Sequence, residues 1–376
     1  MKALILSGGK GTRLQPITHT NAKQLVPVAN KPVLFYTLEA IVAAGINDIG
    51  IVVGDAHKDI EAAVKDGKDF GSDVSITYIH QDQPLGLAHA VKIAQPFLQK
   101  ERFLMFLGDN FIEESLSDLV QQFSAPDRPF HAQVLLKVVP NPEQFGVAQL
   151  CRLDGSPIAY GSCWRDEDVR IVRLVEKPQE PISNLAVVGV YFFDEHIFAA
   201  INAIQPSWRG ELEITDAIQR LIDDGYIVRP HTLAGYWTDT GKVQDMLDAN
   251  RAALSHIKRA ISPEASIDQD SELHGEVILE ENVRLINSVV RGPSAIGCNV
   301  TLSNAYIGPF TSIAQDTVVE NSEIEHSIVL EGCSIHDIDG RIEGSLIGRH
   351  TQIYPSSAKP RAYKLLLGDN SQVGML

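Results

Sequence analysis

The stretch that follows Pro263 constrains the fold most, because aliphatic residues recur there at a short, fixed spacing. Three valines are six residues apart: Val277, Val283 and Val289. Three segments also resemble one another, those that begin at Ile296, Ile307 and Ile347. Such hexapeptide repeats predict a parallel β-helix, in which aliphatic side chains point inward. An antiparallel β domain with glycine turns is the alternative, since the repeats are imperfect and residues 337–341 read as an insertion.

The N-terminus presents a different pattern. Residues 2–6 form a short apolar run, as in a buried parallel strand, and three glycines follow within four positions: Gly8, Gly9 and Gly11. Glycine lets backbone N–H groups come close to a bulky anion, and Arg13 could grip phosphate oxygens at the end of the loop. The sequence therefore predicts a phosphate-binding loop. A tight turn after a buried strand is the alternative, and neither a P-loop nor a dinucleotide fingerprint fits the spacing.

The residues between these two regions alternate between strand and helix patterns. We expect helices over 33–44, 58–65 and 86–97, and strands over 49–53, 74–80 and 103–107. Further strands are predicted over 133–138 and 189–193, and helices from 210 to about 223 and over 242–258. This alternation predicts an α/β domain with a mainly parallel sheet, whose ligands bind beyond the carboxyl ends of the strands. The predicted domains are 1–258, the β-helix over 259–360, and a tail over 361–376.

Composition limits the classes of partner. The chain has 376 residues and a net charge of −16, which argues against a nucleic-acid or acidic-membrane surface. A protein that binds phosphates must then supply positive charge locally. The four cysteines form no C-x-x-C pair, so no zinc site is indicated. No signal peptide and no apolar run of membrane length is evident, and we expect a cytoplasmic protein.

A long ordered signature extends the glycine loop. Gly-Gly-x-Gly-Thr-Arg-Leu is followed by Pro-x-Thr, and then by Lys-Gln-Leu-x-Pro-Val-x-x-Lys-Pro over residues 23–32. The set resembles the sugar-1-phosphate nucleotidyltransferases and is most similar to the glucose-1-phosphate thymidylyltransferases. The resemblance implies a Rossmann-like domain and, as in long forms of the family, a left-handed β-helix. It also implies Mg²⁺-dependent attack of glucose 1-phosphate on the α-phosphorus of dTTP, which yields dTDP-glucose and pyrophosphate.

The resemblance assigns roles to individual residues. Four residues would be catalytic: Arg13, Lys23, Asp109 and Lys177. Those implied to bind the nucleotide are Leu6, Gly8, Gly9, Gly11, Thr12, Arg13, Gln81, Pro84, Gly86 and Asp109. Those implied to bind the sugar phosphate are Asn110, Gly146, Glu176, Lys177, Val187 and Tyr191. Asp109 and Asp239 would hold the metal, a role that suits carboxylates and Mg²⁺.

Some features depart from the family pattern or leave alternatives open. Phe145 stands where many thymidylyltransferases have tyrosine, so a hydroxyl near the sugar is lost. Gln81 can pair with the imide edge of either thymine or uracil, so UTP is an alternative to dTTP. Another sugar 1-phosphate is also an alternative to glucose 1-phosphate. A non-catalytic regulatory subunit of the same fold is a second alternative, and acetyl transfer by the β-helix is a third. The open ends of a β-helix invite pairing with another subunit, and we expect a homo-oligomer.

Overall fold

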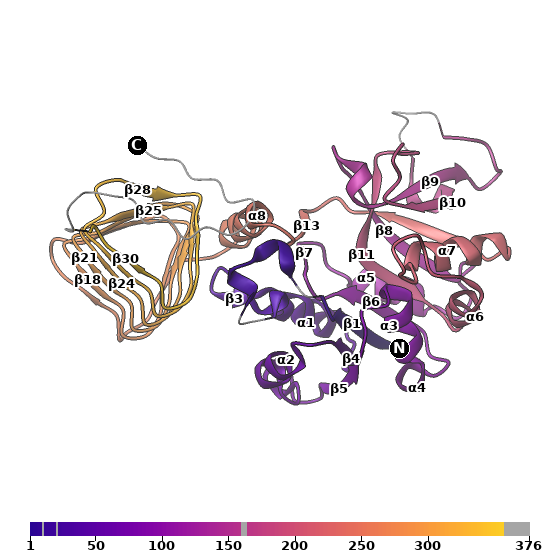
Figure 1. Ribbon diagram of the computed structural model, residues 1–376, viewed down its shortest axis with the longest axis horizontal. Helices are drawn as coiled ribbons and strands as arrows, with labels where there is room; N and C mark the ends of the chain where they lie inside the picture. The colour runs from indigo at the N-terminus through magenta and orange to yellow at the C-terminus, as the bar shows by residue number, and fades with distance from the viewer. Residues whose placement is uncertain (10, 20–21, 159–163, 357–376) are drawn as a thin grey trace. The chain divides into compact units, whose positions relative to one another are not determined.

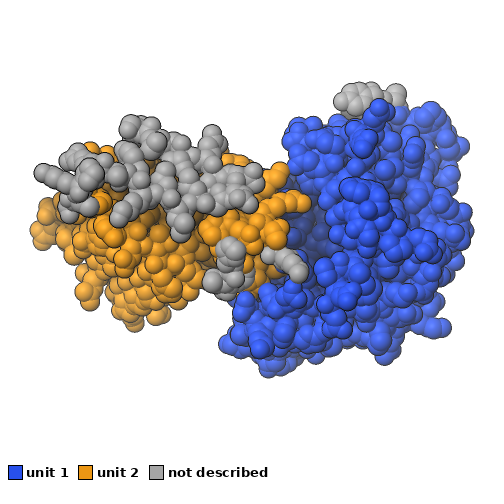
Figure 2. Space-filling view, viewed as in Figure 1, with its two compact units in different colours: residues 1–10, 33–239 blue, residues 11–32, 240–376 orange. Residues whose placement is uncertain are grey.

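The computed structural model describes residues 1–9, 11–19, 22–158 and 164–356 (Figure 1). Its contacts divide the chain into two compact units, coloured separately in Figure 2. Unit 1 comprises residues 1–10 and 33–239, and unit 2 comprises residues 11–32 and 240–376. The contacts thus group segment 11–32 with the C-terminal part of the chain, which the sequence did not indicate. The boundary predicted at 258/259 stays a prediction, and the predicted tail lies outside the described residues.

Unit 1 is built on a nine-stranded sheet, one half of which is parallel. The parallel strands are, in spatial order, β6 (Phe103–Leu107), β1 (Lys2–Ser7), β4 (Asp48–Val53) and β5 (Ser75–His80). The helices that alternate with them and follow them are α1 (Val33–Ala43), α2 (His57–Val64), α3 (Leu87–Ile93), α4 (Gln95–Leu98) and α5 (Ser117–Ser124). The predicted helix over 86–97 is two helices, because Pro96 lacks the N–H needed to continue α3 and sits in the first turn of α4.

The other half of the sheet is largely antiparallel. Strand β11 (Leu185–Phe193) runs antiparallel to β6, β8 and β9. The remaining strands are β8 (Ala132–Val138), β9 (Gly146–Arg152), β10 (Val169–Glu176) and β12 (Val228–Thr232). No helical pattern separates residues 133 and 193, and without a crossover helix successive strands return antiparallel. Helices α6 (His196–Ala203) and α7 (Ile214–Asp223) follow; α7 begins later than predicted, after the turn at Gly210.

A short two-stranded ribbon completes unit 1. Strand β7 (Asn110–Ile112) follows β6 closely and pairs antiparallel with β13 (Trp237–Asp239). In this register Asn110 lies opposite Asp239. The ribbon therefore brings the last residues of unit 1 back to the end of its central strand β6.

Residues 260–353 form the β-helix, drawn at the yellow end of the chain in Figure 1. The first of its three parallel sheets contains β14 (Ala260–Ile261), β17 (Val277–Leu279), β20 (Ser294–Ile296), β23 (Thr311–Ile313), β26 (Ile328–Val329) and β29 (Leu346–Ile347). The second contains β15 (Ser266–Ile267), β18 (Arg284–Ile286), β21 (Thr301–Ser303), β24 (Val318–Glu320), β27 (Ser334–His336) and β30 (Gln352–Ile353). The third contains β16 (Glu272–His274), β19 (Val289–Arg291), β22 (Tyr306–Ile307), β25 (Glu323–Glu325) and β28 (Arg341–Glu343). The left-handed parallel β-helix predicted for this region is confirmed over the antiparallel alternative.

Stacked coils explain the repeat. Aliphatic residues such as Val300, Ile307 and Ile324 are completely buried inside the coils. At one corner Asn287 donates its side-chain amide to Asn304, 17 residues later, and Asn304 donates to Asn321 after 17 more. These corner residues have positive φ, a conformation that asparagine tolerates better than most side chains. One coil is therefore about three hexapeptides long.

Segment 11–32 and helix α8 (Val243–Ser255) belong to the same unit as the β-helix. The segment holds three short 3₁₀ turns, Thr12–Leu14, Ile17–His19 and Lys23–Leu25, and a hairpin of β2 (Pro27–Val28) with β3 (Lys31–Pro32). Among the described residues, no helix is both long enough and apolar enough to cross a bilayer.

Candidate active site

In unit 1, the glycine loop lies against two other loops that leave the parallel strands. Gly8 follows β1, Gly54 follows β4 and Gln81 follows β5. A Cβ atom on Gly8 would lie 3.2 Å from Gln81 Oε1, and one on Gly54 would lie 3.1 Å from the carbonyl oxygen of Gly8. Side chains at these positions would fill the space beside the loop, so the glycines keep this edge of the sheet open to a ligand.

The amide of Gln81 has a defined orientation. Its Nε2 lies 3.0 Å from His89 Nδ1 and 3.4 Å from the carbonyl oxygen of Gly86. Burial, and then the charge of Lys92, lower the pKa of His89, so the neutral ring can accept the hydrogen bond at Nδ1. His89 thus turns the carbonyl end of Gln81 toward Gly8. Sequence reasoning missed His89, whose only signal is its place on the first turn of α3, eight residues after Gln81.

Two other predicted nucleotide-binding residues lie near this amide in sequence. Gly86 has φ +101°, and a side chain there would collide with the carbonyl oxygen of Leu212. Leu212 accepts from the N–H of Ala88 and donates to the carbonyl of Leu85, so the loop before α7 is tied to the segment that precedes α3. Pro84 is exposed on this segment. Leu6, in contrast, is buried within β1 and reaches any ligand only through its backbone.

The two predicted metal-binding residues belong to the ribbon beyond β6: Asp109 directly precedes β7, and Asp239 ends β13. Asp109 Oδ1 accepts from Asn110 Nδ2 at 3.0 Å. Asn110 is the register partner of Asp239, and its own Oδ1 accepts from Trp237 Nε1 at 2.7 Å. Directly opposed residues of an antiparallel pair have Cβ atoms roughly 5 Å apart, so Asp239 lies beside Asn110, the residue that follows Asp109. This donor set of two carboxylates fits Mg²⁺, which prefers one or two carboxylates together with phosphate oxygens.

The predicted sugar-phosphate residues gather around Glu176, at the end of β10. Gly146 is its register partner on β9, and a Cβ on Gly146 would lie 3.1 Å from Glu176 Oε2. Thr215 donates its hydroxyl to the same oxygen at 3.2 Å, and the side chain of Val187 packs close to Gly146. Lys177 follows with φ +42°, and its Nζ lies 4.0 Å from Glu176 Oε1. A ligand at Gly146 would therefore meet both the carboxylate and the ammonium group.

A guanidinium group balances the negative charge here. Arg209 Nη1 lies 3.6 Å from Glu176 Oε1 and 3.3 Å from Glu213 Oε1, and Nη2 lies 3.3 Å from Glu211. Burial, followed by the charge of Glu213, raises the pKa of Glu176. Sequence reasoning missed Arg209, Glu213 and Thr215. Three acids within residues 211–216, just before an apolar helix, are the signal that could have identified this segment.

Tyr191 and Phe145 shape the apolar side of this region. Tyr191 is buried and stacks on Phe193, with ring centroids 5.8 Å apart. Burial, and then Glu176, raise the pKa of its phenol, so the hydroxyl stays protonated. Phe145 packs against Trp237 at 5.3 Å between centroids, and its carbonyl accepts from the N–H of Lys177. The missing hydroxyl at position 145 leaves an aromatic contact in its place.

Unit 2 carries the remaining predicted residues. Gly11 has φ +62°, and its carbonyl oxygen accepts from the Thr18 hydroxyl at 2.7 Å. Thr12 and Arg13 lie in the 3₁₀ turn that follows. Lys23 is buried, and a Cβ atom on Gly11 would lie only 2.9 Å from its Cβ. Gly11, Thr18 and Lys23 therefore lie close together, and Arg13 is exposed on the turn that follows Gly11.

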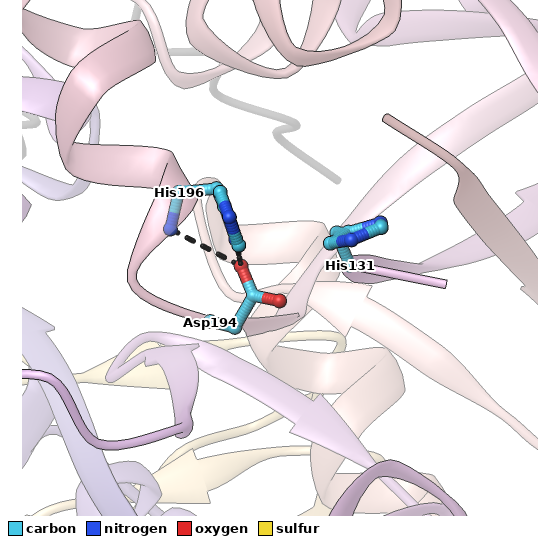
Figure 3. Close-up of side chains that lie close together, drawn as sticks. All are labelled: His131, Asp194 and His196. Atoms are coloured by element: carbon cyan, nitrogen blue, oxygen red, sulfur yellow. Dashed lines mark hydrogen bonds and ion pairs between the residues drawn. The ribbon is translucent and has the colours of Figure 1, made fainter. Parts of the chain in front are cut away.

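A separate cluster of metal-ligating residue types lies in unit 1 at the opposite end of the sheet (Figure 3). His131 precedes β8, and Asp194 and His196 follow β11. Asp194 Oδ1 accepts from the ring Nδ1 of His196 at 2.9 Å, and its Oδ2 is paired with Arg128 at 3.0 Å. Because the guanidinium already pairs with this carboxylate, which also accepts from the backbone N–H of His196, the cluster is best explained as a set of contacts that hold the chain just before α6. It shares no residue with the predicted metal site.

Comparison with known proteins identifies the family. The family described as "Nucleotidyl transferase" matches residues 2–256. The chain belongs to this family. It is 52% identical over 372 residues to the glucose-1-phosphate thymidylyltransferase of Streptomyces griseus, and 50% identical over 373 residues to that of Streptomyces antibioticus. Each alignment covers 99% of this chain and 99% of the relative.

Solved structures agree with this assignment over the N-terminal part. A crystal structure from Bacillus anthracis, described as a glucose-1-phosphate thymidylyltransferase in complex with sucrose, is 34% identical with a TM-score of 0.59. The match covers 69% of this chain and 97% of the other. The chain is therefore a nucleotidyltransferase, and the remainder of its length, outside the 69% that matches, is long enough to hold the β-helix over 260–353.

Proposed function

We propose that this nucleotidyltransferase condenses dTTP with glucose 1-phosphate to form dTDP-glucose and pyrophosphate. The observation that carries the proposal is the β7–β13 pairing, which sets Asp239 opposite Asn110, next to Asp109, at the same sheet edge as the glycine loop. Relatives of 50% identity or more over nearly their full lengths bear this activity in their names. The predicted catalytic residues are all present, which argues against a regulatory subunit.

The proposed chemistry is an in-line attack of the sugar-phosphate oxygen on the α-phosphorus. Both substrates are anions, so the site must first offset their repulsion, and positioning and charge stabilisation then supply most of the rate. Arg13 and Lys23 hold the β and γ phosphates that leave, and Lys177 holds the sugar phosphate. Glu176 accepts hydrogen bonds from sugar hydroxyls. A Mg²⁺ ion bound by Asp109 and Asp239 would supply positive charge at the transferred phosphate.

Base selection is assigned to Gln81. With its carbonyl end turned toward Gly8 and its amide end held by His89, it can meet the imide edge shared by thymine and uracil. A purine or cytosine would leave a buried partner unpaired, at a cost of about 1–3 kcal/mol. UTP shares the edge and lacks one methyl group, which is worth about 1–3 kcal/mol in a filled pocket. We therefore expect dTTP first, UTP at a reduced rate, and other nucleotides poor.

A pyrophosphate-release screen tests the proposal, with five nucleoside triphosphates crossed against a panel of sugar 1-phosphates. The proposal predicts the highest kcat/KM for dTTP with glucose 1-phosphate. A preference for ATP or GTP would refute both the activity and the role of Gln81. A preference for UTP would refute the thymidylyl specificity and leave the reaction class intact.

The metal assignment predicts the effect of Asp109→Asn. We expect kcat to fall by about 10²-fold or more, the usual scale for losing a key electrostatic group. The matched control is Asp118→Asn on the exposed face of α5, which should leave kcat and the Mg²⁺ dependence unchanged. Near-normal turnover of Asp109→Asn over a full Mg²⁺ titration would remove Asp109 from the metal site.

A further inference from the structure

We propose that Asn30 and Asn250 are positioning residues, which place Arg13 and Lys23 by tying segment 11–32 to α8 and the β-helix. The inference rests on the proposed function, in which these two cations hold the triphosphate. It gives the β-helix a role in substrate binding, in addition to the assembly role expected from sequence. All contacts that carry it lie within unit 2.

Asn250 joins three parts of the unit. It lies on α8 with 1% of its surface exposed. Its Oδ1 accepts from the backbone N–H of Ala29 at 2.7 Å and from the hydroxyl of Ser312 at 2.9 Å. Its Nδ2 donates to the carbonyl of Phe310 at 3.0 Å. One buried amide thus holds the β2–β3 hairpin and the β23 coil in a fixed register.

Asn30 makes the second connection. Its Nδ2 donates to the carbonyl of Ile313 at 2.9 Å and lies 3.4 Å from the carbonyl of Ala295. These carbonyls belong to β23 and β20, two successive coils of the first sheet. Asn30 has φ +61°, a conformation that places its short amide at the tip of the hairpin. The hairpin is therefore fastened to two coils of the β-helix.

The same segment carries the cations a few residues earlier. Lys23 packs against Gly11, and the carbonyl oxygen of Gly11 accepts a hydrogen bond from the hydroxyl of Thr18. Lys23 also lies near Asp245 of α8: burial raises the pKa of Asp245, and the Lys242 backbone N–H with the charges of Lys242 and Lys23 opposes that rise. A shift of the hairpin on α8 would therefore move Lys23 and the turn that holds Arg13.

The other end of the segment is fitted more loosely. Ile17 comes within 3.2 Å of where a Cβ on Gly348 would lie, beside a cavity of about 470 Å³. That cavity is lined by Leu14, Pro16, Ile17, Leu330, Leu346 and Ile353, among others. Because this end borders a cavity, the hydrogen bonds of Asn30 and Asn250 at the hairpin are the stronger attachment of the segment.

The variant Asn30→Gly tests the hydrogen bonds that join the hairpin to the β-helix. Glycine adopts positive φ freely, so the variant deletes the amide without backbone strain. We expect the KM for dTTP to rise about tenfold or more, since small displacements of a binding group are costly, while the KM for glucose 1-phosphate stays within about twofold. The control is Asn282→Gly, which removes an amide at φ +59° from the Asn282–Asn299 corner pair and leaves segment 11–32 untouched.

Ser312→Ala provides a second variant, because it removes one of the two bonds to Asn250 Oδ1 and should raise the KM for dTTP less than Asn30→Gly does. Unfolding curves establish that each variant is folded.

Normal KM values for dTTP in both variants, with a raised KM in Arg13→Ala, would overturn the positioning role alone. A normal KM for dTTP in Arg13→Ala would instead overturn the proposed phosphate contact. If Asn282→Gly raised the KM for dTTP as much as Asn30→Gly does, the effect would be a general one of the β-helix, and this too would refute the inference.

Discussion

The β-helix and the carboxyl edge of the unit 1 sheet treat buried polar groups in opposite ways. In the β-helix the buried hydroxyls of Ser294, Thr317 and Ser327 each donate to a backbone carbonyl. At the sheet edge Ser7 Oγ, at the end of β1, is buried and has no hydrogen-bond partner among the described residues. Unsatisfied buried groups are rare and costly, and they are expected where structure serves a ligand. The difference separates a region selected for stability from one selected for binding.

Charge follows the same division. At the sheet edge Glu176, Glu211 and Glu213 crowd around one guanidinium, and burial raises the pKa of Glu176. On the β-helix, Arg341 pairs with Glu323 and Glu325 on the exposed surface, where screening weakens such contacts. We therefore expect the charges at the sheet edge to affect function, and those on the coils to affect it little.

The largest effect is expected from the β-helix interior. Ile324 is completely buried on the third sheet, and Ile324→Ala should lower the free energy of unfolding by about 2–5 kcal/mol. Segment 11–32 contacts the β-helix at β20, β23 and Gly348, on other strands than β25, so kcat and both KM values should stay normal. Ile324→Val is the graded control, with an expected loss of about 0.5–1.5 kcal/mol. Denaturant titration beside steady-state kinetics checks this, and loss of turnover in folded protein would break the comparison.

A smaller loss of stability, joined to a loss of function, is expected at the sheet edge. Arg209→Ala leaves Glu213, whose side chain is 5% exposed, without its cation. The free energy of unfolding should therefore fall by about 1–3 kcal/mol. The KM for glucose 1-phosphate should rise, because Glu176 loses the same partner. The control is Arg220→Ala, which removes an exposed pair with Asp224 on α7 and should change neither quantity measurably. Equal behaviour of the two variants would contradict the division drawn above.

The smallest effect is a change in the pH dependence of stability. Because burial and then Glu213 raise the pKa of Glu176, its contribution to stability is complete below its ordinary value of 4.5 and is lost as pH rises through the raised value. Glu176→Gln is neutral throughout and lacks this loss. The stability of the wild type relative to the variant should therefore fall as pH rises above about 4.5. Urea midpoints across this range measure it, and a constant difference would mean that Glu176 is not desolvated.

Much of this could be predicted from sequence, for identifiable reasons. The parallel strands, the turn glycines and the hexapeptide repeat follow from local patterns, so β1 and β6 were predicted near their observed bounds, and the β-helix was predicted as a fold. Asp109 could be proposed as a site residue because it follows a buried strand after a single glycine, a role that stays a prediction. His89 and Arg209 were not found, since their roles depend on contacts with Gln81 and Glu176 across the fold. The attachment of segment 11–32 to coils 265 and 283 residues later also leaves no local signal.

The attachment of that segment at two heights on the first β-helix sheet bears on how such a chain can evolve. Asn30 contacts β20 and β23, and Ile17 lies at the turn after β29. Repeat domains usually lengthen by duplication of whole coils. Here a duplicated coil between β23 and β29 would separate the two contacts by about 4.8 Å, one strand spacing, and segment 11–32 has a fixed length. Duplications before β20 or after β30 leave that distance unchanged, so length variation among related chains should concentrate at the two ends of the β-helix.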